Sequence, residues 1–412
     1  MNLFHILAIL LTASAVFSYI NHRFLKLPTT IGIMLVALVF SLLLNLLGPI
    51  GIGIENEVER MLGSIAFDET VLHGMLSFLL FAGALHVDLS ELSRQRGVII
   101  SLATLGVVSA TFIIGALSWY AFNLVGLDIP FIYCLLFGAL ISPTDPIAVL
   151  GILKQSNAPK SLEAKITGES LFNDGMAVVV FLLLLRIAAD GMDVSASDAL
   201  LLFSQEAIGG VLFGLGTGII TYFMLKSVDN YQVEVLLTLA LVTGGYATAE
   251  LLHFSAPITV VCAGLLIGNH GRTLAMSGKT REHLDTFWEL VDEVLNAVLF
   301  VLIGLEVLTL VYNQAYLLAG LLAIPIVLLA RFITIGVPIT IMRRFRNFSP
   351  GAIQILTWGG LRGGISVALA LSLADGEVRD ALVVVTYMVV VFSILVQGLT
   401  IGPLIRASNK SP

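Results

Sequence analysis

The sequence predicts an all-α polytopic membrane protein, and three observations lead to this prediction. Of its 412 residues, 58% are hydrophobic and only 12% are charged, whereas about 25% of the residues in a soluble domain are charged. The mean hydropathy is +1.00. Apolar segments long enough to cross a bilayer recur along the whole chain, separated by short polar loops. We therefore expect one membrane domain over residues 1–412, with no soluble domain appended.

Thirteen apolar segments are predicted to be transmembrane helices. They cover residues 3–20, 29–52, 70–86, 97–124, 130–153, 164–188, 205–226, 234–252, 256–271, 288–311, 315–342, 351–373 and 381–405. Two of these segments, 70–86 and 256–271, are short for a full span.

The distribution of Lys and Arg predicts the orientation of these helices. Ala13-Ser14-Ala15 has the pattern of a signal-peptide cleavage site, but Arg23 and Lys26 follow the first apolar run and no basic residue precedes it. With the N-terminus outside, 16 of the 21 Lys and Arg residues fall on the cytoplasmic side and 3 fall outside. This asymmetry favours an outer N-terminus, an odd number of helices and a cytoplasmic C-terminus in a multi-pass cell-membrane protein.

Several classes of protein are disfavoured. Cys134 and Cys262 lie in apolar runs and give neither a disulfide framework nor metal-binding spacing. The chain contains no phosphate-binding loop, no G-x-S-x-G and no H-E-x-x-H sequence, which argues against a nucleotide-driven pump and an intramembrane hydrolase. We expect a protein that is not an enzyme, with no cofactor and with no nucleotide or nucleic acid as partner.

The sixth segment carries polar residues that an apolar helix does not need. Glu169, Ser170, Asn173 and Asp174 occur near its start, although a charged side chain at the centre of a membrane helix costs about 2.5 to 3.5 kcal/mol. In a helix Ser170 and Asp174 share one face, and Glu169 shares another with Asn173. The sequence therefore predicts that one pair lines a site while the other contacts a neighbouring helix.

Two other segments are predicted to be interrupted. The fifth contains Ser142-Pro143-Thr144-Asp145-Pro146, where the prolines remove backbone donors and should unwind the helix. The twelfth contains four glycines around Arg362 between Gly359 and Gly364, which weaken the helix and allow close approach. Because Arg362 keeps its charge, it needs an acidic partner at this depth, and we expect that partner to be Glu169.

The positions of the two breaks predict an inverted repeat. The interrupted helices 5 and 12 are the middle members of helix triplets 4–6 and 11–13, whose starts lie an odd number of helices apart, so the triplets have opposite orientations. Interrupted helices at matching positions of inverted halves indicate a secondary transporter with its site near the middle of the membrane.

Three motifs resemble those of the monovalent cation/proton antiporters of the NhaP/NHE-like branch. They are I-S-P-T-D-P-I at 141–147, G-E-S-L-F-N-D-G at 168–175 and G-G-L-R-G-G-I-S-V-A-L at 359–369. The thirteen-helix layout is similar as well, so the resemblance covers the whole chain. It implies a bacterial Na⁺/H⁺ antiporter that works in pH homeostasis and sodium tolerance.

The resemblance also implies roles for single residues. Asp174 would bind either the cation or the proton, with Asn173 beside it in the motif. Asp145, the Thr144 backbone and the Ser170 hydroxyl would complete an oxygen site for Na⁺. Glu169 and Arg362 would form a buried ion pair between helices 6 and 12. Ala82 stands where some relatives have Glu, so one oxygen ligand would be missing.

The physical chemistry of such a site explains exchange. Oxygen ligands suit hard cations, and desolvation disfavours the charged form of a carboxyl group, so proton and cation compete for one carboxylate. Asn173 stands where related electrogenic antiporters have a second Asp, which implies electroneutral exchange with alternating access. The family resemblance further implies a homodimer in the lipid membrane. Its core helices would be about 97–188 and 315–405, and its scaffold and dimer helices about 3–86 and 205–311.

The ion itself stays open between Na⁺, Li⁺ and K⁺. A K⁺/H⁺ antiporter of the same fold is the first alternative, because nothing in the motifs excludes it. An ion channel is a remote alternative, since a channel does not need a protonatable Asp beside an inverted pair of broken helices. Glu306 and Arg331, in segments 10 and 11, either pair with each other or find other partners.

Overall fold

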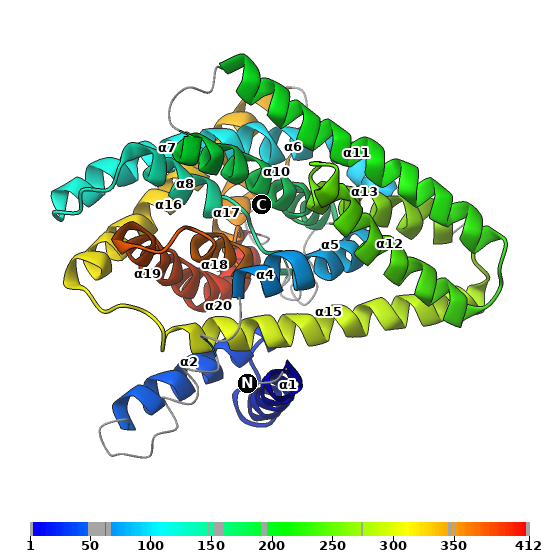
Figure 1. Ribbon diagram of the computed structural model, residues 1–412, viewed down its shortest axis with the longest axis horizontal. Coiled ribbons are helices and arrows are strands. Elements are labelled where there is room, and N and C mark those ends of the chain that lie inside the picture. Colours follow the sequence, from blue (N-terminus) through cyan, green and yellow to red (C-terminus); the bar gives the residue numbers. More distant parts are fainter. Residues whose placement is uncertain are drawn as a thin grey trace.

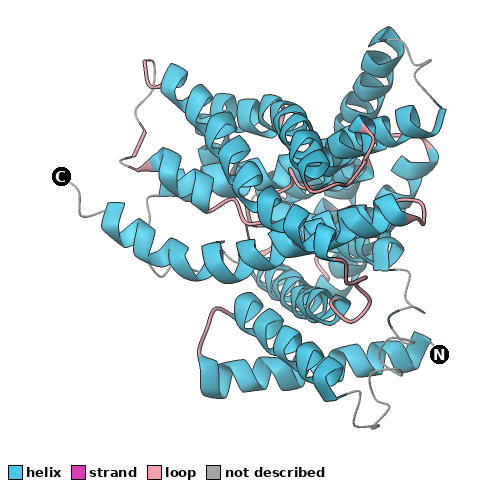
Figure 2. Ribbon diagram, turned by 90° about the vertical axis from the view of Figure 1, so that its left-hand side faces the viewer, coloured by secondary structure: helices cyan, strands magenta, loops and turns pink. Residues whose placement is uncertain are grey.

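The computed structural model describes residues 3–47, 62, 67–146, 149–150, 153, 160–190, 196–272, 275–344, 348–349 and 351–408. These residues form helices and connecting loops, and Figure 2 draws no strand among them. The predicted all-α class is confirmed. The helices and π-helical turns (η) are α1 (Leu3–Ile20), η1 (Asn21–Leu25), α2 (Thr29–Leu47), α4 (Phe67–Glu69), η3 (Thr70–Met75), α5 (Leu76–Leu85), α6 (Leu89–Ala103), α7 (Leu105–Leu124), α8 (Phe131–Leu140), α10 (Lys160–Asp190), α11 (Ala196–Lys226), α12 (Tyr231–Leu251), α13 (Ala256–Leu266), η4 (Ile267–Gly271), α15 (Gly278–Glu306), α16 (Gln314–Met342), α17 (Ala352–Trp358), α18 (Gly364–Leu371), α19 (Glu377–Phe392), η5 (Ser393–Gln397) and α20 (Gly398–Ser408).

Capping residues define where several of these helices begin. A side-chain oxygen of the residue before each helix accepts a hydrogen bond from a backbone N–H of the first turn, which satisfies a donor that the helix itself leaves unpaired. The capping residues are Asp88 for α6, Asn230 for α12, Ser255 for α13, Ser277 for α15 and Asn313 for α16.

Within the described residues, nine helical stretches are long and apolar enough to cross a membrane. Each overlaps one of the predicted segments. The remaining predicted segments correspond to the short apolar helices α8 and α13–η4, to the more polar α15, and to the pair α17 and α18. The count of thirteen transmembrane helices therefore stays a prediction, and most of the second half of predicted helix 5, after Pro146, lies outside the described residues.

The fourth predicted segment differs most from the structure at its start. We expected it to begin at residue 97, but α6 begins at Leu89, directly after its cap Asp88. The charged residues of the first turns conceal this start from a hydropathy window. The helix also bends at Thr104, where α6 passes into α7, and the Thr104 hydroxyl donates to the carbonyl oxygen of Ile100 at 2.6 Å. A Thr side chain that bonds back to the preceding turn in this way commonly bends a helix.

The helix contacts fall into two groups. In the first, α7 packs against α8 and α16, α16 against α19, and α10 against α6 and α8. In the second, α11 and α5 pack against α13, and α2 packs against α15. In Figure 1, α15 runs between the α1–α2 pair and the rest of the molecule. Helix α18 contacts α8 and α19 of the first group and also α4 and α15, so it lies where the two groups meet.

Candidate functional site

The two predicted breaks are present, and they cross each other. After α8 ends at Leu140 the chain leaves the helix through Pro146, and Gly359–Gly363 separate α17 from α18. The N–H of Asp145 donates to the carbonyl oxygen of Leu361 at 2.8 Å, in an antiparallel bridge between the breaks. Backbone groups at membrane depth must be satisfied inside the protein, so each break supplies part of what the other lacks.

The glycines of the second break make room for side chains of the site. A Cβ atom built on Gly363 would lie 2.8 Å from the Cβ and Oδ2 atoms of Asp145. A Cβ atom on Gly360 would lie 2.5 Å from the Nε atom of Arg331. Any larger residue at these two positions would collide with the acid or with the guanidinium group, so the break must be built from glycine for reasons of space.

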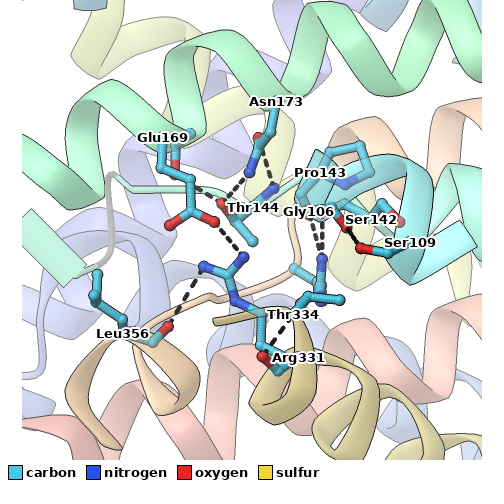
Figure 3. Close-up of polar contacts among 12 residues, drawn as sticks. Gly106, Ser109, Ser142, Pro143, Thr144, Glu169, Asn173, Arg331, Thr334 and Leu356 are labelled. Atoms are coloured by element: carbon cyan, nitrogen blue, oxygen red, sulfur yellow. Dashed lines mark hydrogen bonds and ion pairs between the residues drawn. The ribbon is translucent and has the colours of Figure 1, made fainter. Parts of the chain in front are cut away.

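Three polar side chains converge on the first break (Figure 3). The backbone N–H of Thr144 donates to Oδ1 of Asn173 at 3.3 Å, and Nδ2 of Asn173 donates to the Thr144 hydroxyl at 2.8 Å. That hydroxyl lies 2.8 Å from the hydroxyl of Ser170. The structure thus brings Thr144, Ser170 and Asn173 together. Although Asn173 shares a helix face with Glu169, its amide holds the unwound segment at Thr144.

Asp174 lies next to this cluster, one residue further along α10. Its side chain is only 6% exposed, and its Oδ1 atom accepts no hydrogen bond from the described residues. The charge of Asp145 acts on it. A buried carboxylate oxygen without a donor is costly, and a proton or a small cation at this oxygen would remove that cost.

The predicted ion pair between Glu169 and Arg362 is wrong. Glu169 instead pairs with Arg331 of α16, through its Oε1 atom and Nη1 of the arginine (Figure 3). Both side chains are buried, and Nη2 of Arg331 also donates to the carbonyl oxygen of Leu356 at 3.4 Å. The pair joins α10 to α16, and its arginine packs against Gly360 of the second break.

Arg362 has different partners, which give the physical reason for this correction. Its Nη1 atom donates to the carbonyl oxygens of Ser142 and Pro143, at 2.5 and 3.1 Å. No backbone N–H of the described residues donates to these carbonyls, because α8 ends before them. The C-terminal end of a helix attracts cations. An unwound helix end can therefore satisfy a buried arginine where we had expected an acid.

Arg331 is the residue of this site that the sequence did not assign. We considered it only beside Glu306, whose Oε1 atom accepts instead from the hydroxyl of Thr309 at 2.8 Å. The sequence did contain a sign of its role, because Arg331 and Arg362 both lie within apolar segments and either could pair with Glu169. Ala82 lies buried in α5, where its 1% exposed side chain offers no oxygen.

These features define a class of protein: a helical membrane transporter whose two broken helices cross beside a buried carboxylate. A family model described as the transmembrane sodium/hydrogen exchanger matches residues 10–407. The Na⁺/H⁺ antiporter NhaP of Pseudomonas aeruginosa is 54% identical over 406 residues, which cover 97% of this chain and 96% of that protein. The Na⁺/H⁺ antiporter NhaH of Halobacillus dabanensis is 34% identical over 391 residues, 93% of each chain.

Solved structures agree with the fold. The sodium/proton antiporter MjNhaP1 of Methanocaldococcus jannaschii at pH 8 superposes with a TM-score of 0.73 at 20% identity, over 97% of this chain and 100% of that chain. The chain belongs to the sodium/hydrogen exchanger family, and it is a multi-pass membrane protein.

Proposed function

We propose that this protein is a secondary antiporter that exchanges Na⁺ for H⁺ across the cell membrane. The observation that carries the proposal is the buried Asp174, whose Oδ1 atom accepts no hydrogen bond from the described residues, beside two crossed broken helices. The choice of Na⁺ is supported by the names of the relatives, NhaP and NhaH, which are called Na⁺/H⁺ antiporters.

The cation ligands in this proposal are oxygen atoms that lie around the first break. They are the carboxylates of Asp174 and Asp145, the hydroxyl of Ser170, and Thr144. Oxygen donors of this kind suit a hard monovalent cation. The two hydrogen bonds between Asn173 and Thr144 hold the unwound segment beside α10, so the ligands are already positioned before the ion arrives.

Exchange follows from competition at Asp174. When a cation enters, it replaces the proton on the carboxyl group, and when a proton returns it displaces the cation. If only the occupied site can change sides, uptake of one ion is coupled to release of the other. Asn173 is a neutral amide, so one carboxylate on α10 exchanges one cation for one proton, and the cycle moves no net charge.

The two buried arginines act as fixed charges in this mechanism. Arg331 is neutralised by Glu169 and Arg362 is held by the carbonyls at the end of α8. Neither group needs to gain or lose a proton during transport. We infer that they keep the two breaks aligned while Asp174 changes its occupant.

The arrangement in the membrane is part of the same proposal. The excess of Lys and Arg in alternate loops supports an outer N-terminus and a cytoplasmic C-terminus. The two groups of helix contacts support a core, about 97–188 and 315–405, that moves against a scaffold, about 3–86 and 205–311. We propose that the scaffold forms a homodimer within the lipid and that transport needs no cofactor.

The test uses everted membrane vesicles that hold a preformed pH gradient. Addition of Na⁺ should collapse the gradient in the parent protein and not in Asp174→Ala, at equal amounts of protein in the membrane. Full activity of Asp174→Ala would overturn the assignment of the site. The same measurement with Li⁺ and K⁺, and with the membrane potential clamped, determines the preferred ion and the stoichiometry.

A further inference from the structure

One face of α15 is directed toward the second break. Asp292, Asn296 and Leu299 follow one another at spacings of four and three residues, so they share this face. Leu299 lies against Gly364, the first residue of α18, because a Cβ atom on that glycine would lie 2.6 Å from Cδ1 of Leu299. A helix of the second contact group therefore meets the broken helix of the first group at this point.

Asp145 lies beside Gly363, the glycine that precedes Gly364 in the chain. Its side chain contacts Gly363, as described above, while Leu299 contacts Gly364. From Leu299, the residues Asn296 and Asp292 lie about 5 and 10 Å further toward the N-terminus of α15, given a rise of about 1.5 Å per residue.

One polar atom on this face, the Oδ1 atom of Asn296, has unused binding capacity. Asn296 is 3% exposed, and its Nδ2 atom donates to the backbone oxygen of Asp292 at 2.8 Å. Its Oδ1 atom is buried and accepts no hydrogen bond from the described residues. Asp292 is half-buried, while its acidic neighbours Glu289 and Glu293 are exposed. A carboxylate and an amide oxygen that has no donor among the described residues thus lie one helical turn apart, on the face of α15 that meets the second break.

Two other acids share this face and provide a contrast: Asp285, which pairs with Arg272, and Glu306. Glu306 lies fourteen residues after Asp292 in α15, beside a cavity of about 320 Å³ that Asp380 and Arg379 also line. Its carboxylate accepts a hydrogen bond from Thr309 at 2.8 Å. Glu306 therefore has a partner in the protein, whereas the oxygen atom of Asn296 has none among the described residues.

We propose that Asp292 and the Oδ1 atom of Asn296 form a second binding station for the transported cation, which passes it to Asp145 and Asp174. This inference depends on the proposed function and adds a site to it. In the proposed orientation the station opens to the cytoplasm, since it lies toward the N-terminal end of α15. It belongs to the scaffold, so the cation moves between a fixed carboxylate and the carboxylates of the moving core.

The test measures the KM for Na⁺ from each side of the membrane. Everted vesicles present the cytoplasmic face and right-side-out vesicles present the outer face. Asp292→Asn should raise the KM at the cytoplasmic face about 10-fold with less than a 2-fold change in the maximal rate, because the station contributes to binding and not to the later steps. Asn296→Leu, which keeps the volume and removes the oxygen, should raise the same KM about 3-fold or more.

Two further variants make the outcome specific. Asp292→Glu keeps the charge and should restore a KM close to that of the parent, which a purely structural role would not predict. Glu293→Gln removes an exposed acid at the same depth on another face and should leave the KM unchanged. If Asp292→Asn does not accumulate in the membrane, the KM values of Asn296→Leu and Asp292→Glu at the cytoplasmic face are compared with that of the parent instead.

Opposite results separate the two proposals. If the parent shows no Na⁺-driven exchange, the proposed function is wrong. If the parent is active and neither Asp292→Asn nor Asn296→Leu raises the cytoplasmic KM, the station is wrong and the antiporter proposal stands. Equal increases of the KM at both faces would also overturn the station, because they would indicate a general disturbance of the Asp174 site.

Discussion

The break after α8 and the break between α17 and α18 meet at one backbone hydrogen bond, yet they are built from different residues. The first uses prolines, which remove backbone donors, and no backbone N–H of the described residues donates to the carbonyls of Ser142 and Pro143. The second uses glycines, which leave space, and an arginine that donates to those carbonyls. The inverted halves are therefore complementary and not equivalent: one supplies acceptors and an acid, and the other supplies a donor and room.

This difference also explains why the two buried arginines are not interchangeable. Arg331 holds a carboxylate of α10, whereas Arg362 holds the end of α8. The first contact joins two helices through opposite charges, and the second completes the backbone of a broken helix. Substitutions at these two contacts test the division of roles, and smaller effects are expected at Gly363 and at the cap of α6.

The largest effect is expected from separating Glu169 and Arg331. Glu169→Gln leaves Arg331 buried without its counterion, and the loss of one partner of a buried pair typically costs about 3 to 5 kcal/mol. Thermal unfolding in detergent should show this loss. The double variant Glu169→Gln/Arg331→Met should recover much of it, while Glu169→Gln/Arg362→Met should be less stable still. Recovery by the Arg362 change instead would contradict the observed pairing.

A smaller loss is expected from Arg362→Met, which leaves the carbonyls of Ser142 and Pro143 without their donor. A buried polar group left unpaired costs about 1 to 3 kcal/mol, so we expect a total near the upper end of that range. Arg362→Lys keeps a charged donor and should lose less stability in the same unfolding assay. An equal loss in both variants would show that the carbonyl contacts contribute little.

Gly363→Ala tests the space that the second break provides for Asp145. The added Cβ atom would lie 2.8 Å from the Asp145 side chain, and overpacking of this kind typically costs about 1 to 3 kcal/mol. The backbone of Gly363 has φ −119°, a conformation that alanine can adopt, so the effect should come from the collision with Asp145 and not from backbone strain. The KM for Na⁺ should rise.

The matched control for Gly363→Ala is Gly244→Ala in α12. A Cβ atom there meets nothing within 4 Å, so this variant should keep the parental KM. A parental KM in Gly363→Ala as well would mean that Asp145 can move aside without affecting transport.

The smallest effect is expected far from both breaks, at the cap of α6. Asp88 accepts hydrogen bonds from the backbone N–H groups of Ser90 and Glu91 at 2.8 and 3.4 Å, and these bonds, that of Ser90 first, lower its pKa. Asp88→Ala should cost about 1 kcal/mol of stability, typical of a lost helix cap. It should leave the exchange rate unchanged.

The pH dependence of this cap follows from the sign of the shift. Because the folded protein favours the charged form of Asp88, the stabilisation is fully present at neutral pH and is lost as the pH falls through the lowered pKa of the folded state. The stability difference between Asp88→Ala and the parent should therefore shrink only in strong acid. A difference that grows toward acid pH would contradict this.

The sequence was sufficient to predict the two breaks, because Pro143, Pro146 and the four glycines act locally on the backbone. The family resemblance implied that Ser170, Thr144 and Asn173 belong to one site, but helix geometry grouped Asn173 with Glu169, and only the structure shows its amide at Thr144. The sequence could not predict the partner of Glu169, since that depends on which helix packs beside α10. Arg331 and Arg362 are equally capable of pairing with an acid, and only the arrangement of α16 against the core distinguishes them.

The polar face of α15 was missed for a similar reason. Asp292 lies among Glu289 and Glu293 in the sequence, and all three acids look alike there. Only the contact of Leu299 with Gly364 identifies which of them is directed toward the site. The periodicity of a helix tells which residues share a face, but the neighbour of that face is a property of the tertiary structure.

The hydrogen bond from Asp145 to Leu361 has a consequence for how the protein can move. It connects the two breaks at the proposed ion site, so a displacement of one break must also move the other. The amide proton of Asp145 should then exchange with deuterium as slowly as the amides in the middle of α10, even though it lies in an unwound segment. The least regular part of the backbone would thus be among the last to open.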